Sequence, residues 1–293
     1  MATLPNPLPR LAADPSGRGL GLELPPGRLI DATGEGPWHE PLLWHAGRPA
    51  SSGNWARLGA PGARVGLLPV LLDIGGEQGG PGEWELLPGQ MSYPGDHDAE
   101  EVLAALWEEY AAHAPGVDDD YPGKERVVEI FGEPASYDET VAPFGAEWPG
   151  LAAAPRLEAD PDARAAEVAD SLLDEGSWFK EPCLALVPAR RSADIPAAIG
   201  WSGPLNYEDD VARLGSVLRS WEDRFGIRVV ALTYDRLVLS VAAPPATPAE
   251  AEAVAAEHFA FCPDNITQGH HETLSEYAGH EVLGQRVWSF WWD

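Results

Sequence analysis

The sequence predicts an α+β protein whose C-terminal part, residues 181–293, forms a ferredoxin-like sheet with one extra short helix. Short apolar runs in this part alternate with two capped helices, of which the first has an apolar stripe. With the short helix set aside, the elements follow the order β-α-β-β-α-β, which is the ferredoxin-like pattern. Residues 1–95 contain strand fragments and loops. Because a ferredoxin-like sheet carries its helices on one face, we expect a loop-rich α+β N-terminal half to pack against the other face.

The expected strands are apolar runs bounded by turn residues. CLALVPA (183–189) is a short buried strand, and IRVVALT (227–233) and LVLSVA (237–242) form a hairpin around YDR. The terminal VWSFWWD alternates as a last strand. In the N-terminal half, the clearest strand is GLLPVLLDI (66–74).

The expected helices are marked by their first residues. Asn206 is suited to be the N-cap of a helix that ends at Gly226. One apolar stripe runs along this helix, made of Val211, Leu214, Leu218, Trp221 and Phe225. A second helix runs to about Phe261 and starts with a capping box, made of Thr247, Pro248 and Glu250. Thr273 and Glu276 repeat the box before the extra short helix.

The element pattern also predicts the domain organisation. Asp160 followed by Pro161 opens one more helix, which precedes the C-terminal strands. We therefore expect an acidic, loop-rich α+β region over residues 1–155, a bridging helix over 156–180 and a C-terminal α+β domain over 181–293.

The net charge of −28, from 47 acidic and 19 basic residues, is the largest compositional signal. Such a charge repels nucleic-acid phosphates and anionic lipid, so we expect neither nucleic-acid nor membrane binding. It favours a basic protein partner or a cation, or it simply keeps the protein in solution. No stretch of 18 apolar residues and no secretory signal is present, and we expect a cytoplasmic protein whose cysteines, Cys183 and Cys262, are reduced structural thiols.

HFAFCPDNI (258–266) gathers residue types that carry chemistry. His258 and Cys262 are four residues apart, which places both on one face of a continuing helix, as two ligands of a divalent metal would be. Further candidate residues for binding follow at the end of this helix and beyond it, namely Asp264, Asn265, His270 and His271. Pro263 favours the alternative, a helix stop at which the aromatic residues and Cys262 pack inward.

Twelve tryptophans offer a second kind of candidate site. Trp288 and Trp292 share one side of the terminal strand and Trp291 lies on the other, so both faces of that strand are covered or one is a binding surface. Trp201 and Trp291 are the tryptophans that we single out as candidates for binding a ligand or partner, because exposed aromatic residues mark interfaces.

Several blocks together resemble a known family. GWSGPLNY, SWEDRFG, PPATPAEAEAVAAEHFAFCPDNI and VWSFWWD are similar to the C-terminal domain of the bacterial family catalogued as domain of unknown function 4253. APFGAEWPGLA (142–152) is similar to an upstream segment of longer actinobacterial members. The resemblance implies a cytoplasmic bacterial protein, and it implies no catalytic residue because the family brings no established activity.

The sequence favours a soluble, non-enzymatic binding protein with an immunity-like or regulatory role, whose acidic surface engages a protein partner and which needs no cofactor. The alternative is a metal-dependent or small-molecule-processing enzyme with its site near residues 258–271. A third hypothesis places a small ligand on the open sheet face, beneath the N-terminal half.

Overall fold

The structure is a computed structural model, and it describes residues 5–113, 136–157, 159–174 and 176–293. The chain forms two compact units, each assembled from segments that are distant in the sequence. Unit 1 comprises Met1–Ala99, Ala154–Ala243 and Arg286–Asp293, and unit 2 comprises Glu100–Ala153 and Pro244–Gln285. None of the helices in the described residues is both long and apolar enough to cross a membrane.

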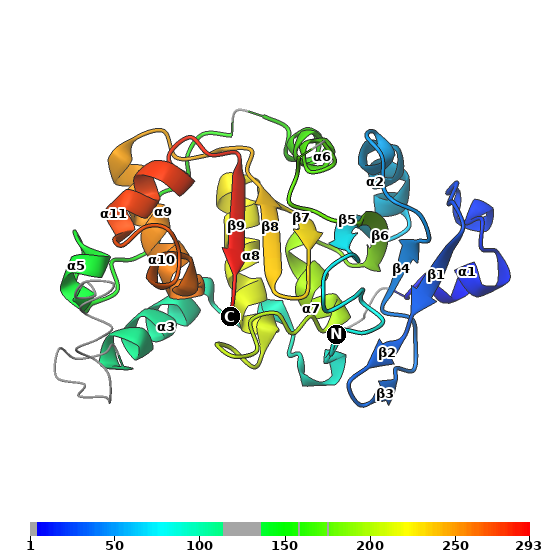
Figure 1. Ribbon diagram of the computed structural model, residues 1–293, viewed down its shortest axis with the longest axis horizontal. Helices are drawn as coiled ribbons and strands as arrows, with labels where there is room; N and C mark the ends of the chain where they lie inside the picture. The colour runs from blue at the N-terminus through cyan, green and yellow to red at the C-terminus, as the bar shows by residue number, and fades with distance from the viewer. Residues whose placement is uncertain (1–4, 114–135, 158, 175) are drawn as a thin grey trace. The chain divides into compact units, whose positions relative to one another are not determined.

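Unit 1 is built on a mixed sheet (Figure 1). In spatial order its strands are β1 (Gly27–Ile30), β4 (Leu43–Ala46), β6 (Pro182–Pro188), β5 (Leu67–Asp73), β7 (Arg228–Leu232), β8 (Arg236–Ser240) and β9 (Val287–Trp291). Neighbouring strands are antiparallel except for β5 and β7, which are parallel. A small separate hairpin joins β2 (Ala32–Thr33) to β3 (Gly36–Pro37).

The α+β class is confirmed, but the ferredoxin-like order predicted for residues 181–293 is not the order observed. Strand β5, from the N-terminal half, lies between β6 and β7. β5 and β6 are both almost wholly buried apolar strands, and they pair over seven positions from Leu67 opposite Pro188 to Asp73 opposite Pro182. The N-terminal half therefore contributes strands to the sheet, whereas we expected it to cover a face. Strand pairing between such distant segments leaves no local signal in the sequence.

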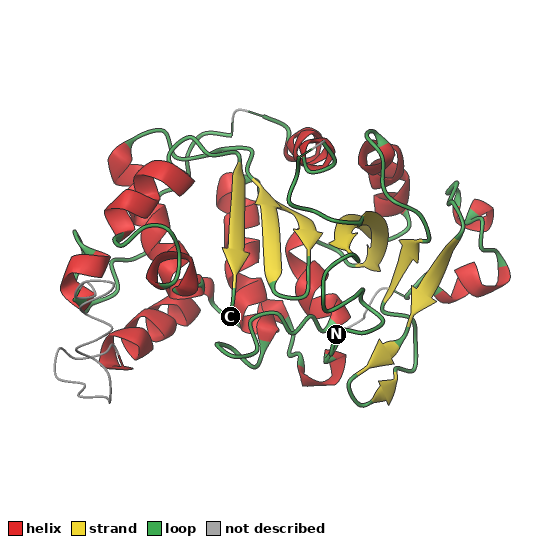
Figure 2. Cartoon of the chain, viewed as in Figure 1, coloured by secondary structure: helices red, strands yellow, loops and turns green. Residues whose placement is uncertain are grey.

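Helices cover both faces of this sheet, and Figure 2 shows helices and strands in separate colours. On one face, α2 (Asn54–Arg64) packs on β5 and α6 (Pro161–Ser171) packs on β7 and β8. The core on this side contains Trp55, Leu58, Leu71, Val168, Val230 and Val238. Since α6 packs on the sheet, the helix that we expected to bridge two domains is a covering layer of unit 1.

The other face of the sheet carries an aromatic core beneath α8 (Val211–Phe225). The ring of Trp221 is stacked on Phe290, with centroids 5.4 Å apart, and meets Trp288 edge-on at 5.6 Å. Trp288 and Phe290 alternate along β9 with the exposed Ser289, as the sequence pattern indicates. The short helix α7 (Ile195–Ile199) packs on α8 and β6.

The start of α8 differs from the sequence prediction. The helix begins at Val211, and the Asp210 side chain caps it by accepting a hydrogen bond from the backbone N–H of Ala212. Asn206, which we expected to be the cap, donates from Nδ2 to the backbone oxygen of Asp293 at 2.6 Å. The residues from Asn206 to Asp210 form a turn and a bend before the helix, so Asp210 provides the cap. The helix ends as predicted at Gly226, whose φ is 62°.

The described residues of unit 2 are helical. They form α3 (Ala99–His113), which enters the unit at Glu100, α5 (Tyr137–Val141), α9 (Pro248–Phe261), α10 (Asp264–Thr267) and α11 (Leu274–Tyr277), followed by a π-helical turn (Ala278–Val282). The capping box predicted at Thr247 and Glu250 is confirmed. Phe259 of α9 packs edge-on against Trp107 and Tyr110 of α3, which joins the two long helices of the unit.

Within the described residues, the other regular elements are short segments of unit 1, namely α1 (Pro9–Ala13) and the 3-10 turns Arg18–Leu20, Pro88–Gln90, Pro94–Asp96 and Ser192–Asp194. The two compact units do not coincide with the ranges 1–155, 156–180 and 181–293 expected from the sequence. Strands from both sides of residue 180 share one sheet, and α9, which we expected on that sheet, belongs to unit 2.

Candidate functional site

Three of the residues singled out in the 258–271 segment meet around Tyr277 of unit 2. His258 Nδ1 lies 3.1 Å from the Tyr277 hydroxyl, and Asn265 Nδ2 donates to the same hydroxyl at 3.2 Å. The Cys262 thiol is directed at Asn265 Oδ1, 3.6 Å away. We call these four residues the His258 cluster. The sequence pointed to three of them, while Tyr277 lies beyond the segment and carried no signal.

The His258 cluster is neutral, and its His258, Cys262 and Tyr277 side chains are buried while Asn265 is partly exposed. His258 is fully buried, and this burial lowers its pKa to about 3. Burial also raises the pKa of Tyr277, so the phenol stays protonated. A neutral imidazole, a phenol, an amide and a thiol that hydrogen-bond to one another hold the end of α9 against α10 and α11. This geometry fits the helix-stop interpretation of the segment.

The other candidates in the segment lie apart from the cluster. Asp264 Oδ1 accepts from Gln268 Nε2 at 3.0 Å, and His270 is exposed. His271 Nε2 lies 3.1 Å from Glu281 Oε1, and its ring is stacked on His280. In the part of the chain that the structure describes, no three His, Cys, Asp or Glu side chains gather in a way that could hold a metal ion.

The two candidate tryptophans have different surroundings in unit 1. Trp201 is buried, and its indole N–H donates to the backbone oxygens of Thr233 and Tyr234, so it fixes the turn between β7 and β8. Trp291 is half-buried on β9, and its indole N–H donates to Asp235 Oδ2 at 3.1 Å. Of the two, Trp291 therefore has a face available at the surface.

Trp291 belongs to an exposed group of aromatic and cationic side chains. Arg236 lies directly opposite it in the β8–β9 register, and the Arg236 guanidinium carbon is 5.9 Å from the Trp291 ring centroid and 5.3 Å from that of Trp178. Trp178 is 47% exposed, and Tyr234, two residues before Arg236, is 39% exposed. We call Trp178, Arg236 and Trp291 the aromatic patch. Trp178 was missed in the sequence because it lies in a segment far from Arg236 and Trp291.

Cys183, the other cysteine, has a histidine neighbour that the sequence did not indicate. His45 Nδ1 lies 3.7 Å from Cys183 Sγ, and Arg28 Nε donates to His45 Nε2 at 2.6 Å. Burial raises the pKa of Cys183 to about 12 and lowers the pKa of His45. The thiol therefore stays protonated and unreactive, as expected of a structural cysteine.

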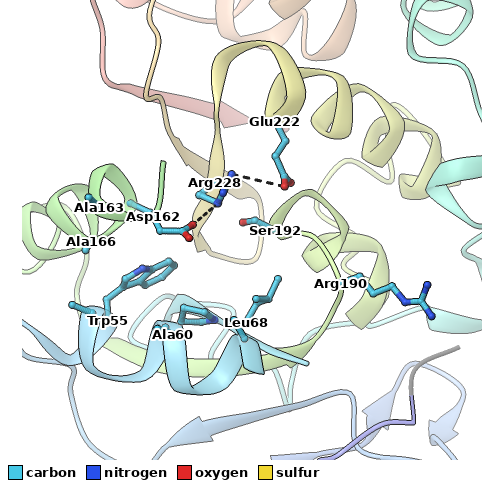
Figure 3. Close-up of a pocket in the computed structure, with 15 residues that line it drawn as sticks. Trp55, Ala60, Leu68, Asp162, Ala163, Ala166, Arg190, Ser192, Glu222 and Arg228 are labelled. Carbon is cyan, nitrogen blue, oxygen red and sulfur yellow. Dashed lines mark hydrogen bonds and ion pairs between the residues drawn. The ribbon is translucent and has the colours of Figure 1, made fainter. Parts of the chain in front are cut away.

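Unit 1 also has a pocket of about 410 Å³, lined by parts of α2, β5, α6 and β7, by Arg190 and Ser192, and by Glu222 of α8. Figure 3 shows Trp55, Ala60 and Leu68 on one side of it, and Asp162, Arg228 and Glu222 on the other. Arg228 Nε donates to Asp162 Oδ1 at 2.7 Å, and Arg228 Nη1 lies 3.8 Å from Glu222 Oε1. The lining comes from five separate segments of the chain, so no sequence motif could indicate it.

The chain was compared with protein families, curated proteins and solved structures. Neither a curated protein nor a solved structure matches it. Residues 183–293, which span β6 to β9 and the helices between them, match the family model described as Domain of unknown function (DUF4253), and this confirms the resemblance expected for the C-terminal part of the sequence.

Proposed function

We propose that the protein is a non-enzymatic binding protein that engages a basic protein partner through the aromatic patch of unit 1. The observation that carries this proposal is the Arg236 guanidinium lying within 6 Å of two tryptophan rings, with Trp178 left 47% exposed. Tryptophan, tyrosine and arginine are the residue types that dominate binding energy at protein interfaces. The aromatic patch contains two of these types, tryptophan and arginine.

The patch is also held in one arrangement before any partner arrives. Arg236 and Trp291 form a cross-strand pair, and Asp235 accepts the Trp291 indole N–H. The segment with Trp178 is anchored next to it by Phe179, whose side chain is buried in the core under α2 and α6. A preorganised surface loses little conformational entropy on binding, which favours affinity.

The charge of the whole chain supports a basic partner. With a net charge of −28, the protein attracts positively charged proteins and repels acidic ones before contact. This is the behaviour that an immunity-like or regulatory protein needs against a basic target such as a nuclease toxin. The enzyme alternative near residues 258–271 has less support, because His258 and Tyr277 are buried away from any substrate.

The test is capture of a partner from the source cell at low salt, followed by binding measurements with that purified partner. We expect a protein with a basic isoelectric point whose dissociation constant rises about fivefold or more in Trp178→Ala and in Arg236→Ala, because loss of an interface anchor costs more than about 1 kcal/mol. Affinity should also fall as salt rises, because screening weakens attraction between opposite charges.

Leu157→Ala is the matched control, since Leu157 is 51% exposed and lies outside the aromatic patch. This variant should bind like the native chain. A captured partner whose affinity is the same for the native chain, Trp178→Ala and Arg236→Ala would exclude the patch as the binding surface. An acidic partner would contradict the electrostatic part of the proposal.

A further inference from the structure

The pocket of unit 1 has a polar side and an apolar side. Its apolar side is formed by one face of α2, from Trp55 to Ala63, together with Leu68 and Pro69 of β5. Its polar side is formed by Asp162, Ser192, Glu222 and Arg228 (Figure 3). A volume of about 410 Å³ lies within the range of small-molecule sites.

Two side chains on the polar side, Ser192 and Arg228, can donate a hydrogen bond to a ligand. Ser192 Oγ accepts a hydrogen bond from the backbone N–H of Val229 at 2.8 Å, which leaves its hydroxyl proton to be donated. Arg228 uses Nε for Asp162 and Nη1 for the backbone oxygen of Ile227. Among the contacts of the described residues, none engages Arg228 Nη2.

The acceptors on the same side are less available. Glu222 Oε2 accepts the backbone N–H of Ala193 at 2.9 Å, and Glu222 Oε1 faces Arg191 and Arg228. Asp162 is the exception, because its side chain is 81% exposed and pairs with Arg228 at the surface. A surface ion pair of this kind contributes little, so an incoming acid group readily replaces Asp162 beside Arg228.

From these observations we propose that the pocket binds a small molecule with one carboxylate and an apolar body. The carboxylate lies against Arg228 and Ser192, where an arginine offers two parallel N–H donors to one carboxylate. The N-terminal end of α6, which contributes Asp162 and Ala163 to the lining, adds its positive dipole end. The apolar body lies against Trp55 and the small side chains of α2, where one or two rings have room.

This site is independent of the aromatic patch, and it is tested on the full chain by calorimetric titration with phenylacetate. Phenylacetamide and phenethylamine are the matched probes, since they have the same ring and a neutral or cationic head. We expect phenylacetate to bind with a dissociation constant of about 1 mM or lower, and the other two to bind about tenfold more weakly or less.

Two variants separate the proposed site from a general effect on the fold. Asp162→Asn removes the competitor for Arg228 and should tighten phenylacetate binding about threefold or more. Ala60→Phe places a ring in the pocket from an exposed helical position and should weaken binding about tenfold or more. Glu167→Gln, on the same helix but outside the lining, removes one negative charge as Asp162→Asn does and should change nothing.

Three results would overturn the proposal. The first is binding of phenylacetamide or phenethylamine as tightly as phenylacetate. The second is equal phenylacetate affinity in Asp162→Asn and Glu167→Gln, or unchanged affinity in Ala60→Phe. The third is the absence of phenylacetate binding at about 10 mM in both the native chain and Asp162→Asn.

Discussion

His258 makes the stability of unit 2 depend on pH. In the folded state burial lowers its pKa to about 3, whereas an unfolded histidine titrates near about 6.5. The unfolded chain therefore takes up the proton first, so the stability linked to His258 is complete above about pH 6.5 and is lost as pH falls toward about 3. Between pH 7 and pH 5 we expect the free energy of unfolding to fall by about 2 kcal/mol more in the native chain than in His258→Gln.

Urea unfolding at the two pH values measures this difference, and His270→Gln is the control because His270 is exposed. His270→Gln should keep the native pH dependence. Some pH dependence will remain in His258→Gln, since burial also lowers the pKa of His45 in unit 1. The same pH dependence in both variants would show that His258 does not titrate in this way.

At the scale of single residues, the sequence indicated His258, Cys262 and Asn265 of the His258 cluster. It did not indicate Tyr277, whose hydroxyl lies at the centre of the cluster. Spacing along a helix brought His258 and Cys262 together, because residues four apart share a face. Asp264 and Asn265 are adjacent, and only Asn265 reaches Tyr277, since neighbouring residues of a helical turn point in different directions. Tyr277 arrives through tertiary packing of α11, which local spacing does not encode.

At the scale of elements, the N-terminus of α9 gives a direct test of local sequence coding. The Thr247 hydroxyl accepts from the backbone N–H of Glu250, and the Glu250 carboxylate accepts from the backbone N–H of Thr247. We expect Thr247→Ala to lower the free energy of unfolding by about 1 kcal/mol. Thr247→Ser keeps the hydroxyl and should lose far less, and urea unfolding compares the two. Equal losses would mean that the hydroxyl contributes nothing.

Elements whose signals are local were predicted well, and those that depend on distant contacts were not. The strand predicted at 66–74 is β5, Leu67–Asp73, and the box at Thr247 starts α9 as expected. The start of α8 was wrong because Asn206 and Asp210 are both suited to cap a helix. Asp210 provides the cap, and Asn206 donates to Asp293, 87 positions away, a contact that no local pattern indicates.

At the scale of the whole molecule, the net charge of −28 predicts a response to salt. Repulsion among acidic groups destabilises the folded state, and salt screens it over about 10 Å at 0.1 M. We expect the melting temperature to rise by about 2 °C or more between about 20 mM and 300 mM NaCl. KCl should have the same effect, because screening does not depend on the identity of the monovalent cation. A melting temperature that stays constant or falls would contradict this expectation.

The arrangement of the sheet and the pocket could not be predicted for a related reason. The order of strands depends on which of several similar apolar runs pair, and LLPVLLD and PCLALVP give no local sign that they are partners. The pocket depends on that pairing, since β5 brings Leu68 and Pro69 to the helices that complete its wall. Sequence patterns therefore predicted individual strands and helices of unit 1 but not the order in which the strands pair.

The place of β5 has an evolutionary consequence. The region that matches the family begins at residue 183, yet β6 and β7 within it are joined only through a strand encoded more than a hundred residues earlier. Recombination that moved this region alone would separate β6 and β7 from β5, the strand that lies between them. If the gap closed, β6 and β7 would meet as antiparallel partners, because β5 is antiparallel to one and parallel to the other. The sheet arrangement of this region therefore depends on a strand outside it.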